Sequence, residues 1–297
     1  MTATAPTAAA ASTPAAGRPR PVERPQFGAV TYLNSKPLIE DLADLIAPAA
    51  LSQDYPSHLA RDLADQRLDV ALVPSFSALR GLVDGSAWLL SDACVASRGP
   101  VRSVKLLCRC HPGEVRTLAL DAGSRTSQAL VQIILQEHYG AQPRLQPFPL
   151  ETATRDCDAD AILMIGDRAM TPPPGDRFVD VLDLGEVWTR WTGLPFVFAV
   201  WATRHAEVPA EWAEALATAR DRGLARIDAI AEREAAALHL TDADAAGYLR
   251  NNLHFTLGSA ERAGLALFAE LATECGLLPA APAVREARVE AVQRRSA

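Results

Sequence analysis

Lysine is almost absent from this chain of 297 residues, since only Lys36 and Lys105 occur among its 29 basic residues, against 36 acidic ones. The formal net charge is −7, and the arginines do not gather into a basic stripe. Proteins that bind nucleic acid use clustered Lys and Arg to neutralise phosphates. We therefore expect no nucleic-acid partner.

Cysteine is also scarce. The five cysteines are odd in number and scattered, so a disulfide framework is not expected and a reducing cytoplasm fits better. Cys108 and Cys110 would share one face of a strand just before His111, which makes a fragment of a metal site the alternative interpretation. No second CxxC or HxxxH motif supplies further ligands. We therefore favour structural thiols at Cys108 and Cys110 and expect no bound metal.

Long apolar runs are missing as well. No segment approaches the ~18 uncharged apolar residues that a membrane helix needs, so no membrane partner is expected. Residues 1–25 are rich in Ala, Thr and Pro, and their first positive charge, Arg18, follows the alanines. A signal peptide has the opposite order. These features predict a disordered tail over 1–25 and a cytoplasmic protein.

Three common catalytic motifs do not occur. The sequence has no GxGxxG, no P-loop and no GxSxG elbow. Dehydrogenase, kinase and hydrolase interpretations therefore lose their main support.

Two similar units of alternating strand and helix patterns organise the rest of the chain. Each has a strand, a helical crossover and a second strand that opens with an Asp before an apolar run. The first unit spans 27–74, with strands at 27–33 and 68–74 and helices near 37–46 and 57–66; the second spans 117–166, with a helix over 126–138. This repetition predicts two α/β lobes.

Two further strands, at 101–108 and 194–202, are natural places for the chain to leave the first lobe and return to it. Helices are predicted beyond them, at 210–238, at 242–252 after a Thr241 cap, and at 260–274 between a Ser259 cap and Gly276. The predicted division is lobe 1 over 26–108 plus 202–280, lobe 2 over 109–201, and a C-terminal tail over 281–297. We expect two hinged α/β lobes with a central cleft, the layout of type II periplasmic binding proteins.

The stretch TYLNSKPL at 31–38 joins the first predicted strand to its helix. Ser35 is a plausible helix cap, and Pro37 fits the first helical turn, where a missing N–H costs nothing. Asn34 would then lie at the carboxyl end of a strand, where open α/β sheets bind ligands. An Asn that merely suits a turn is the structural alternative.

Five blocks in the same order resemble the menaquinone-biosynthesis family of chorismate dehydratases. They are YLNSKPL at 32–38, SDACVASRGPVRSVKLL at 91–107, LALDAGSRTSQALVQIIL at 118–135, AILMIGDRAM at 161–170 and DLGEVWTRWTGLPFVFAVWA at 183–202. The resemblance covers about residues 26–280. It implies a cytoplasmic lyase of the futalosine route that converts chorismate to 3-[(1-carboxyvinyl)oxy]benzoate and water, on a binding-protein-like fold without a metal or organic cofactor.

Candidate site residues follow from these blocks. The resemblance favours Asn34 and Ser103 as catalytic residues and Ser97 with Arg98 as substrate-binding residues of the cleft. The structural alternatives are turn chemistry for Ser97 and a strand position on the solvent side for Ser103. The segment from Ser124 through Arg125 and Thr126 to Ser127 is a hydroxyl-rich helix start, whose N–H groups suit a substrate carboxylate, although Ser124 can also be a plain cap. Gly166 and Asp167 end a strand and either border the cleft or cap the next helix.

Neither Asn34 nor Ser103 is basic at neutral pH, which argues against a simple acid–base scheme. We therefore predict substrate-assisted elimination, in which a carboxylate of chorismate takes the proton, with Asp167 as the first protein base to consider. Two other functions stay open: a cytoplasmic binding or sensor protein for small carboxylates, and the sister dihydroxynaphthoate synthase of the same pathway. The oligomeric state is not predicted.

Overall fold

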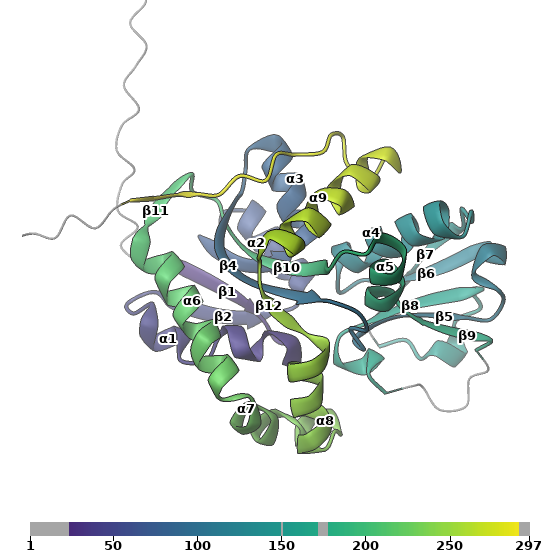
Figure 1. Ribbon diagram of the computed structural model, residues 1–297, viewed down its shortest axis with the longest axis horizontal. Coiled ribbons are helices and arrows are strands. Elements are labelled where there is room, and N and C mark those ends of the chain that lie inside the picture. Colours follow the sequence, from purple (N-terminus) through teal and green to yellow (C-terminus); the bar gives the residue numbers. More distant parts are fainter. Residues whose placement is uncertain (1–23, 150, 172–177, 291–297) are drawn as a thin grey trace, which may run out of the picture.

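The computed structural model describes residues 24–290, apart from residue 150 and residues 172–177, and it contains two large β-sheets that stand side by side (Figure 1). The first lobe is built on a six-stranded sheet with the order β12-β4-β10-β3-β1-β2. Its strands are β1 (Gln26–Val30), β2 (Ala50–Asp54), β3 (Val70–Pro74), β4 (Trp88–Ser97), β10 (Phe196–Thr203) and β12 (His254–Thr256). β1 pairs in parallel with β2 and β3, whereas β10 runs antiparallel between β3 and β4.

The second lobe is built on a five-stranded sheet with the order β7-β6-β8-β5-β9. Its strands are β5 (Val104–Cys108), β6 (Thr117–Asp121), β7 (Arg144–Phe148), β8 (Ala161–Ile165) and β9 (Asp180–Asp183). All five residues of β8, like those of β3, are buried, as expected for apolar runs in a sheet covered on both faces. The two-lobed fold predicted from the repeated units is confirmed.

Helices cover both sheets. The α-helices are α1 (Leu42–Leu45), α2 (Pro56–Ala64), α3 (Ser75–Asp84), α4 (Arg125–Ile133), α5 (Leu184–Thr192), α6 (Ala210–Ala225), α7 (Ile227–Glu234), α8 (Asp242–Gly247) and α9 (Ser259–Glu274). Short 3-10 segments are η1 (Leu33–Leu38), η2 (Pro112–Glu114), η4 (Thr154–Asp156), η5 (Asp167–Ala169) and η6 (Ala236–Leu238), and η3 (Ile134–His138) and η7 (Tyr248–Asn252) are π-helical. None of the helices in the described ranges is both long and apolar enough to cross a membrane.

Several predicted boundaries differ from the structure. The first strand ends at Val30 and not at residue 33, because the next residues turn into η1. The ten-residue strand β4, which includes part of a predicted turn at 96–100, was not predicted, and neither were the short strands β2, β7, β9, β11, β12 and β13. The strand expected over 101–108 starts at Val104 and pairs only within the second sheet. The predicted lobe boundaries at 108 and 202 therefore fall too late, since β5 belongs to the second sheet and β10 to the first.

The two ends of the chain were predicted to be tails. Residues 1–23 and 291–297 lie outside the described residues, so the predicted disorder of 1–25 is not tested there. Residues 281–290 belong to the first lobe: β13 (Arg288–Glu290) pairs with β11 (Glu207–Pro209), and the Ala287 N–H donates to the Leu89 carbonyl over 2.8 Å. The start of the predicted C-terminal tail is therefore ordered by pairing.

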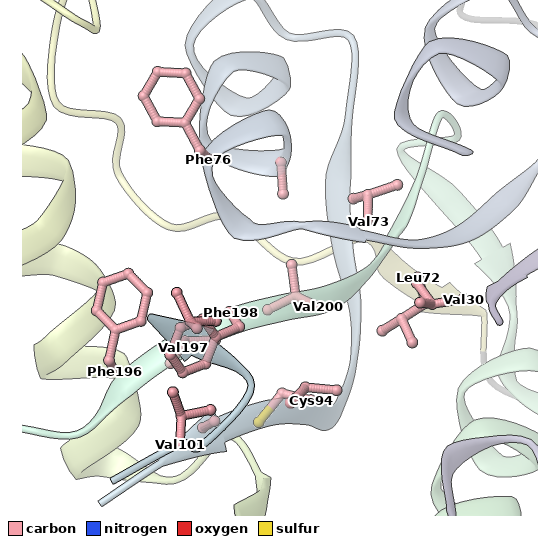
Figure 2. Close-up of a cluster of buried hydrophobic side chains, with 14 of the residues drawn as sticks. Val30, Leu72, Val73, Phe76, Cys94, Val101, Phe196, Val197, Phe198 and Val200 are labelled. Atoms are coloured by element: carbon pink, nitrogen blue, oxygen red, sulfur yellow. The ribbon is translucent and has the colours of Figure 1, made fainter. Parts of the chain in front are cut away.

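Aromatic packing joins the lobes. The rings of Trp188 and Phe196 lie 5.1 Å apart, and Phe196 lies 5.0 Å from Phe268 of α9. Trp188 and Phe196 are fully buried, in agreement with the core or hinge role that their sequence pattern predicts. On the first-lobe side, Figure 2 shows apolar side chains from β1, β3 and β10 gathered in one buried cluster.

Candidate functional site

A narrow cleft with a cavity volume of about 40 Å³ lies between the lobes. Its lining comes from both sheets, from the segment between β4 and β5, and from the starts of several helices. The described lining residues are Val30, Tyr32, Asn34, Pro56, Leu72, Pro74, Val95, Val101, Ser103, Val104, Ser124, Ser127, Ile165, Gly166, Phe198 and Ala199. Five of the ten predicted site residues are among them: Asn34, Ser103, Ser124, Ser127 and Gly166.

Asn34 lies on η1, directly after the turn that ends β1. The sequence predicted Ser35 as a helix cap, and this prediction is wrong. Its hydroxyl is buried and donates to the carbonyl of Tyr32 over 2.8 Å, and it also contacts the carbonyl of Val30. Ser35 therefore closes the turn from within, which fixes the backbone that carries Asn34.

The position of η1 also depends on α6. A Cβ atom added at Gly223 of α6 would lie only 2.0 Å from the carbonyl oxygen of Pro37. A side chain at residue 223 would push the two elements apart, so glycine is required for this close approach. Asn34 is thus held by packing from behind as well as by its own turn.

Ser103 is the last residue before β5 and stands where the chain crosses between the lobes. Its carbonyl accepts the N–H of Gly166 over 2.9 Å. The preceding residues are fixed by Asp183, whose carboxylate accepts the N–H groups of Val101 over 2.9 Å and Arg102 over 2.6 Å. Burial raises the pKa of Asp183, although these N–H groups favour its ionised form. The crossing segment is therefore held at several points.

Tyr248, which the sequence did not single out, contacts the predicted catalytic residue Ser103. Its ring is fully buried at the start of η7, and its hydroxyl donates to the Ser103 hydroxyl oxygen over 2.8 Å. Asn34 acts against the effect of burial on the pKa of this phenol, as Ser103 does. Burial raises the pKa of Tyr248 well above its ordinary value, so this group stays neutral. Within the sequence, Tyr248 is an ordinary aromatic residue of a predicted helix, and no local pattern marks it.

The start of α4 faces the cleft through two of its four predicted residues. Ser124 caps the helix, as predicted: its side chain accepts the N–H of Ser127 over 3.3 Å, and both serines line the cleft. Thr126 is fully buried instead, and its hydroxyl oxygen accepts the N–H of Phe76 at the start of α3 over 3.0 Å. Arg125 is exposed and stands outside the described lining. Thr126 thus connects the lobes.

Ser97 and Arg98 stand beside the cleft and not among its described lining residues. Ser97 ends β4 and is buried so tightly against Gly185 that a Cβ atom there would lie 2.6 Å from the serine oxygen. Arg98 donates to the buried carboxylate of Glu261 over 2.8 Å. The Ser97 hydroxyl has no hydrogen-bond partner among the described residues and packs against Gly185 of α5, whereas Arg98 is paired with Glu261 of α9 in the first lobe.

Gly166 and Asp167 form the edge that the second lobe presents to η1. Gly166 has φ of 71°, and a Cβ atom there would lie 2.9 Å from the ring of Tyr32. The Asp167 carboxylate accepts the N–H of Leu33 over 3.2 Å, next to Asn34. Burial raises the pKa of Asp167 to about 6, while the Leu33 N–H and Lys36 partly oppose that shift. A hydrogen bond between lobes therefore ends beside the predicted catalytic amide.

Asp121 organises the same edge from inside the second lobe. Its buried carboxylate accepts the N–H of Gly123 over 2.8 Å and that of Ile165 over 3.3 Å, and it pairs with Arg168. These bonds tie the loop before α4 to the end of β8. The two second-lobe segments of the cleft are therefore fixed relative to each other.

Three helices begin at the cleft. Pro56 is the first residue of α2, Pro74 precedes α3, and Ser124 caps α4, and all three residues line the cavity. Each helix start carries roughly half a positive charge and free N–H groups. The described lining contains no Asp, Glu, His, Lys or Arg side chain. The cleft is thus apolar and uncharged, with local fields that favour carboxylates.

Cys108 and Cys110 differ in burial, since Cys108 is buried and Cys110 is partly exposed. Among the residues that the structure describes, no group of three or more His, Cys, Asp or Glu side chains has a metal-site arrangement. Cys108 is buried on β5, and burial raises the pKa of its thiol.

Comparison with known proteins places the chain in a family. A family model described as menaquinone biosynthesis matches residues 25–274. The chain belongs to the menaquinone-biosynthesis family. Within it, the chain is 36% identical over 232 residues to a chorismate dehydratase from Thermus thermophilus, a match that covers 72% of this chain and 83% of that protein. The family resemblance predicted from the five blocks is confirmed.

Solved structures share the fold at low sequence identity. Protein AF1704 from Archaeoglobus fulgidus has a TM-score of 0.66 at 15% identity, covering 87% of this chain and 100% of that one. The periplasmic aliphatic sulphonate binding protein SsuA from Escherichia coli has a TM-score of 0.62 at 15% identity, covering 93% of this chain and 94% of that one. These likenesses confirm the binding-protein fold and say nothing further of function.

Proposed function

We propose that this protein is a chorismate dehydratase, a carbon–oxygen lyase that converts chorismate to 3-[(1-carboxyvinyl)oxy]benzoate and water. The family match and the identity to the Thermus thermophilus enzyme support this activity. The observation in the site that supports it most is the convergence of three helix starts on an uncharged cleft that carries Asn34 and Ser103. Such a cleft suits a small dianion with an apolar ring.

The reaction requires loss of a ring proton and of a hydroxyl group. In chorismate, the C3–H is vinylogous to the ring carboxylate, so its removal moves negative charge into that carboxylate. The C4–O bond then breaks, the hydroxide leaves with a proton as water, and the ring becomes aromatic. N–H and O–H donors at the start of α4 would stabilise the charge that develops on the ring carboxylate, an effect that often contributes most to catalysis.

The proton acceptor in this proposal is the enolpyruvyl carboxylate of the substrate. The lining supports this choice, because none of its described side chains is a carboxylate or an imidazole. The sequence analysis named Asp167 as the first protein base to consider in place of the substrate carboxylate. Its carboxylate, however, accepts the N–H of Leu33, and Asp167 is not among the described lining residues. Asn34 would orient the reacting groups and assist the leaving hydroxyl.

The test is direct incubation of the purified protein with chorismate, followed by mass spectrometry for a product lighter by one water. We expect turnover with and without a chelator, and a large loss of kcat with a smaller change in KM for Asn34→Ala. Arg125→Ala, on the exposed side of α4, is the control and should react normally. Chorismate that binds but stays intact at high protein concentration would contradict the enzyme proposal and favour a binding or sensor protein.

A further inference from the structure

Tyr32 lies in the turn between β1 and η1 and lines the cleft from the first lobe. Its ring packs against Gly166 of the second lobe, where an added Cβ atom would lie 2.9 Å from the ring carbons Cε1 and Cζ. Its hydroxyl oxygen lies close to Gly123, where an added Cβ atom would be 3.0 Å away. The phenol therefore extends from the first lobe to the loop that leads into α4.

We propose that the Tyr32 hydroxyl is a further substrate-binding group, which donates a hydrogen bond to the substrate carboxylate held at the start of α4. This inference rests on the proposed function and deepens it, because it names a further group that binds the same carboxylate. Gly123 directly precedes Ser124, the cap of α4. The first N–H groups of a helix have no partner within it, so a carboxylate in front of α4 would receive donors from the second lobe and from Tyr32 of the first.

The proton of the Tyr32 hydroxyl is available for such a bond. Within the described part of the chain this hydroxyl makes no hydrogen bond, and its oxygen is not among the fully buried polar atoms that lack a partner. The neighbouring Asp121 carboxylate is engaged by other donors, the N–H groups of Gly123 and Ile165. A substrate carboxylate would therefore give the phenol the acceptor that the described residues do not supply.

The phenol is held in place and stays protonated. The Tyr32 carbonyl accepts the N–H of Ser35 over 3.1 Å and the Ser35 hydroxyl over 2.8 Å, which fixes the turn. Burial raises the pKa of Tyr32 well above its ordinary value, and the nearby Asp121 carboxylate acts in the same direction. The phenol is therefore a neutral donor at neutral pH. A donor that is fixed before binding loses little entropy when the bond forms.

Tyr32→Phe separates the donor from the packing, because it keeps the ring on Gly166 and removes only the hydroxyl. A hydrogen bond to a charged group is about twice as strong as a neutral one, so we expect kcat/KM for chorismate to fall about tenfold or more. Tyr55→Phe is the matched control: its ring lies 6.0 Å from that of Tyr32, but Tyr55 is not among the described lining residues. Tyr55→Phe should leave kcat/KM unchanged.

Binding measured by calorimetry tests the hydroxyl without catalysis. The probe is 3-methoxybenzoate, which carries the ring carboxylate of the proposed product and cannot be dehydrated, and its neutral counterpart is 3-methoxybenzamide. We expect Tyr32→Phe to weaken binding of the carboxylate about tenfold or more, and binding of the amide by about threefold at most. Thermal melts should match the wild-type protein, because the hydroxyl has no partner among the described residues to lose.

Three results would overturn the inference. They are equal affinities of the two proteins for 3-methoxybenzoate, an equal loss for the carboxylate and the amide, and no binding of 3-methoxybenzoate to the wild-type protein at millimolar concentration. Failure of the proposed function would look different. Chorismate that stays intact while 3-methoxybenzoate binds in a Tyr32-dependent manner would contradict the dehydratase proposal and leave the role of Tyr32 standing.

Discussion

The substitution Asp167→Asn tests whether Asp167 is a catalytic base or only a contact between the lobes. The Asp167 carboxylate accepts the N–H of Leu33, and burial raises its pKa to about 6 from the ordinary value of 3.8. The Asn side chain removes the charge and keeps an oxygen that can accept the same N–H. The variant therefore keeps the hydrogen bond between the lobes but has no carboxyl group at residue 167 that can gain or lose a proton.

The size of the stability effect follows from proton linkage. The folded protein binds the Asp167 proton more tightly than the unfolded chain does, so this carboxyl favours the folded state most below pH ~4. Its contribution falls as the pH rises from the unfolded pKa to about 6, and then stays constant. A shift of roughly two pKa units corresponds to about 3 kcal/mol in the free energy of unfolding, which is the upper limit of the effect.

Thermal melting of both proteins from pH 4.5 to 8 measures this difference. Asp167→Asn should be slightly more stable than the wild-type protein at pH 4.5, and its advantage should grow until about pH 6 and stay constant above it. Asp160→Asn is the control with the opposite sign: burial raises the pKa of Asp160, but the N–H groups of Arg116 and Thr117 outweigh that effect and lower it. Asp160→Asn should therefore lose stability at neutral pH.

Activity measurements complete the test of Asp167. If the substrate carboxylate takes the proton, kcat of Asp167→Asn should stay within about fivefold of the wild-type value, because the contact to Leu33 persists. A loss of about 10³-fold or more at unchanged stability would refute this reasoning and identify Asp167 as the general base. An identical pH dependence of melting in the two proteins would refute the assigned titration.

Other substitutions test how the cleft is built. Gly223→Ala introduces a methyl group 2.0 Å from the carbonyl of η1, so kcat should fall through displacement of the segment, and circular dichroism should show a folded protein. Thr126→Val removes the acceptor of an inter-lobe N–H and should lower the free energy of unfolding by about 1–3 kcal/mol in denaturant melts, with little change in KM. Ser124→Ala should instead raise KM about tenfold or more, because its hydroxyl lines the cleft; unchanged kinetics would place the substrate carboxylate elsewhere.

Local patterns were sufficient to predict much of the fold. The buried strands β3 and β8 are continuous apolar runs, and Ser124 and Thr241 cap their helices as predicted. The short strands β2 and β12 were missed because they carry partly exposed, mixed residues whose pairing depends on neighbours far away in the chain. Boundaries at the crossing segments were also missed, since sheet membership is decided by partners and not by the strand's own sequence.

Some residues of the candidate site could likewise be predicted from the sequence, and others could not. Ser124 and Gly166 adjoin the ends of strands, and such ends meet at the cleft, whereas the choice of Asn34 depended on the family resemblance. Tyr248 could not be found, because its contact with Ser103 joins residues 145 positions apart. Thr126 was placed in the cleft by its neighbours, although its hydroxyl faces the opposite lobe. Helix periodicity alone does not say which hydroxyl of a first turn meets which partner.

The position of β10 has a consequence for how the chain folds during synthesis. β10 lies between β3 and β4, so neither of these earlier strands can complete its pairing until residue 203 has been made. The second sheet is assembled entirely from strands at 104–183 and needs no later segment for its pairing. It can therefore form first on the ribosome, while β3 and β4 wait with open edges. Open strand edges promote aggregation, so slow translation just before β10 should lower the yield of folded protein.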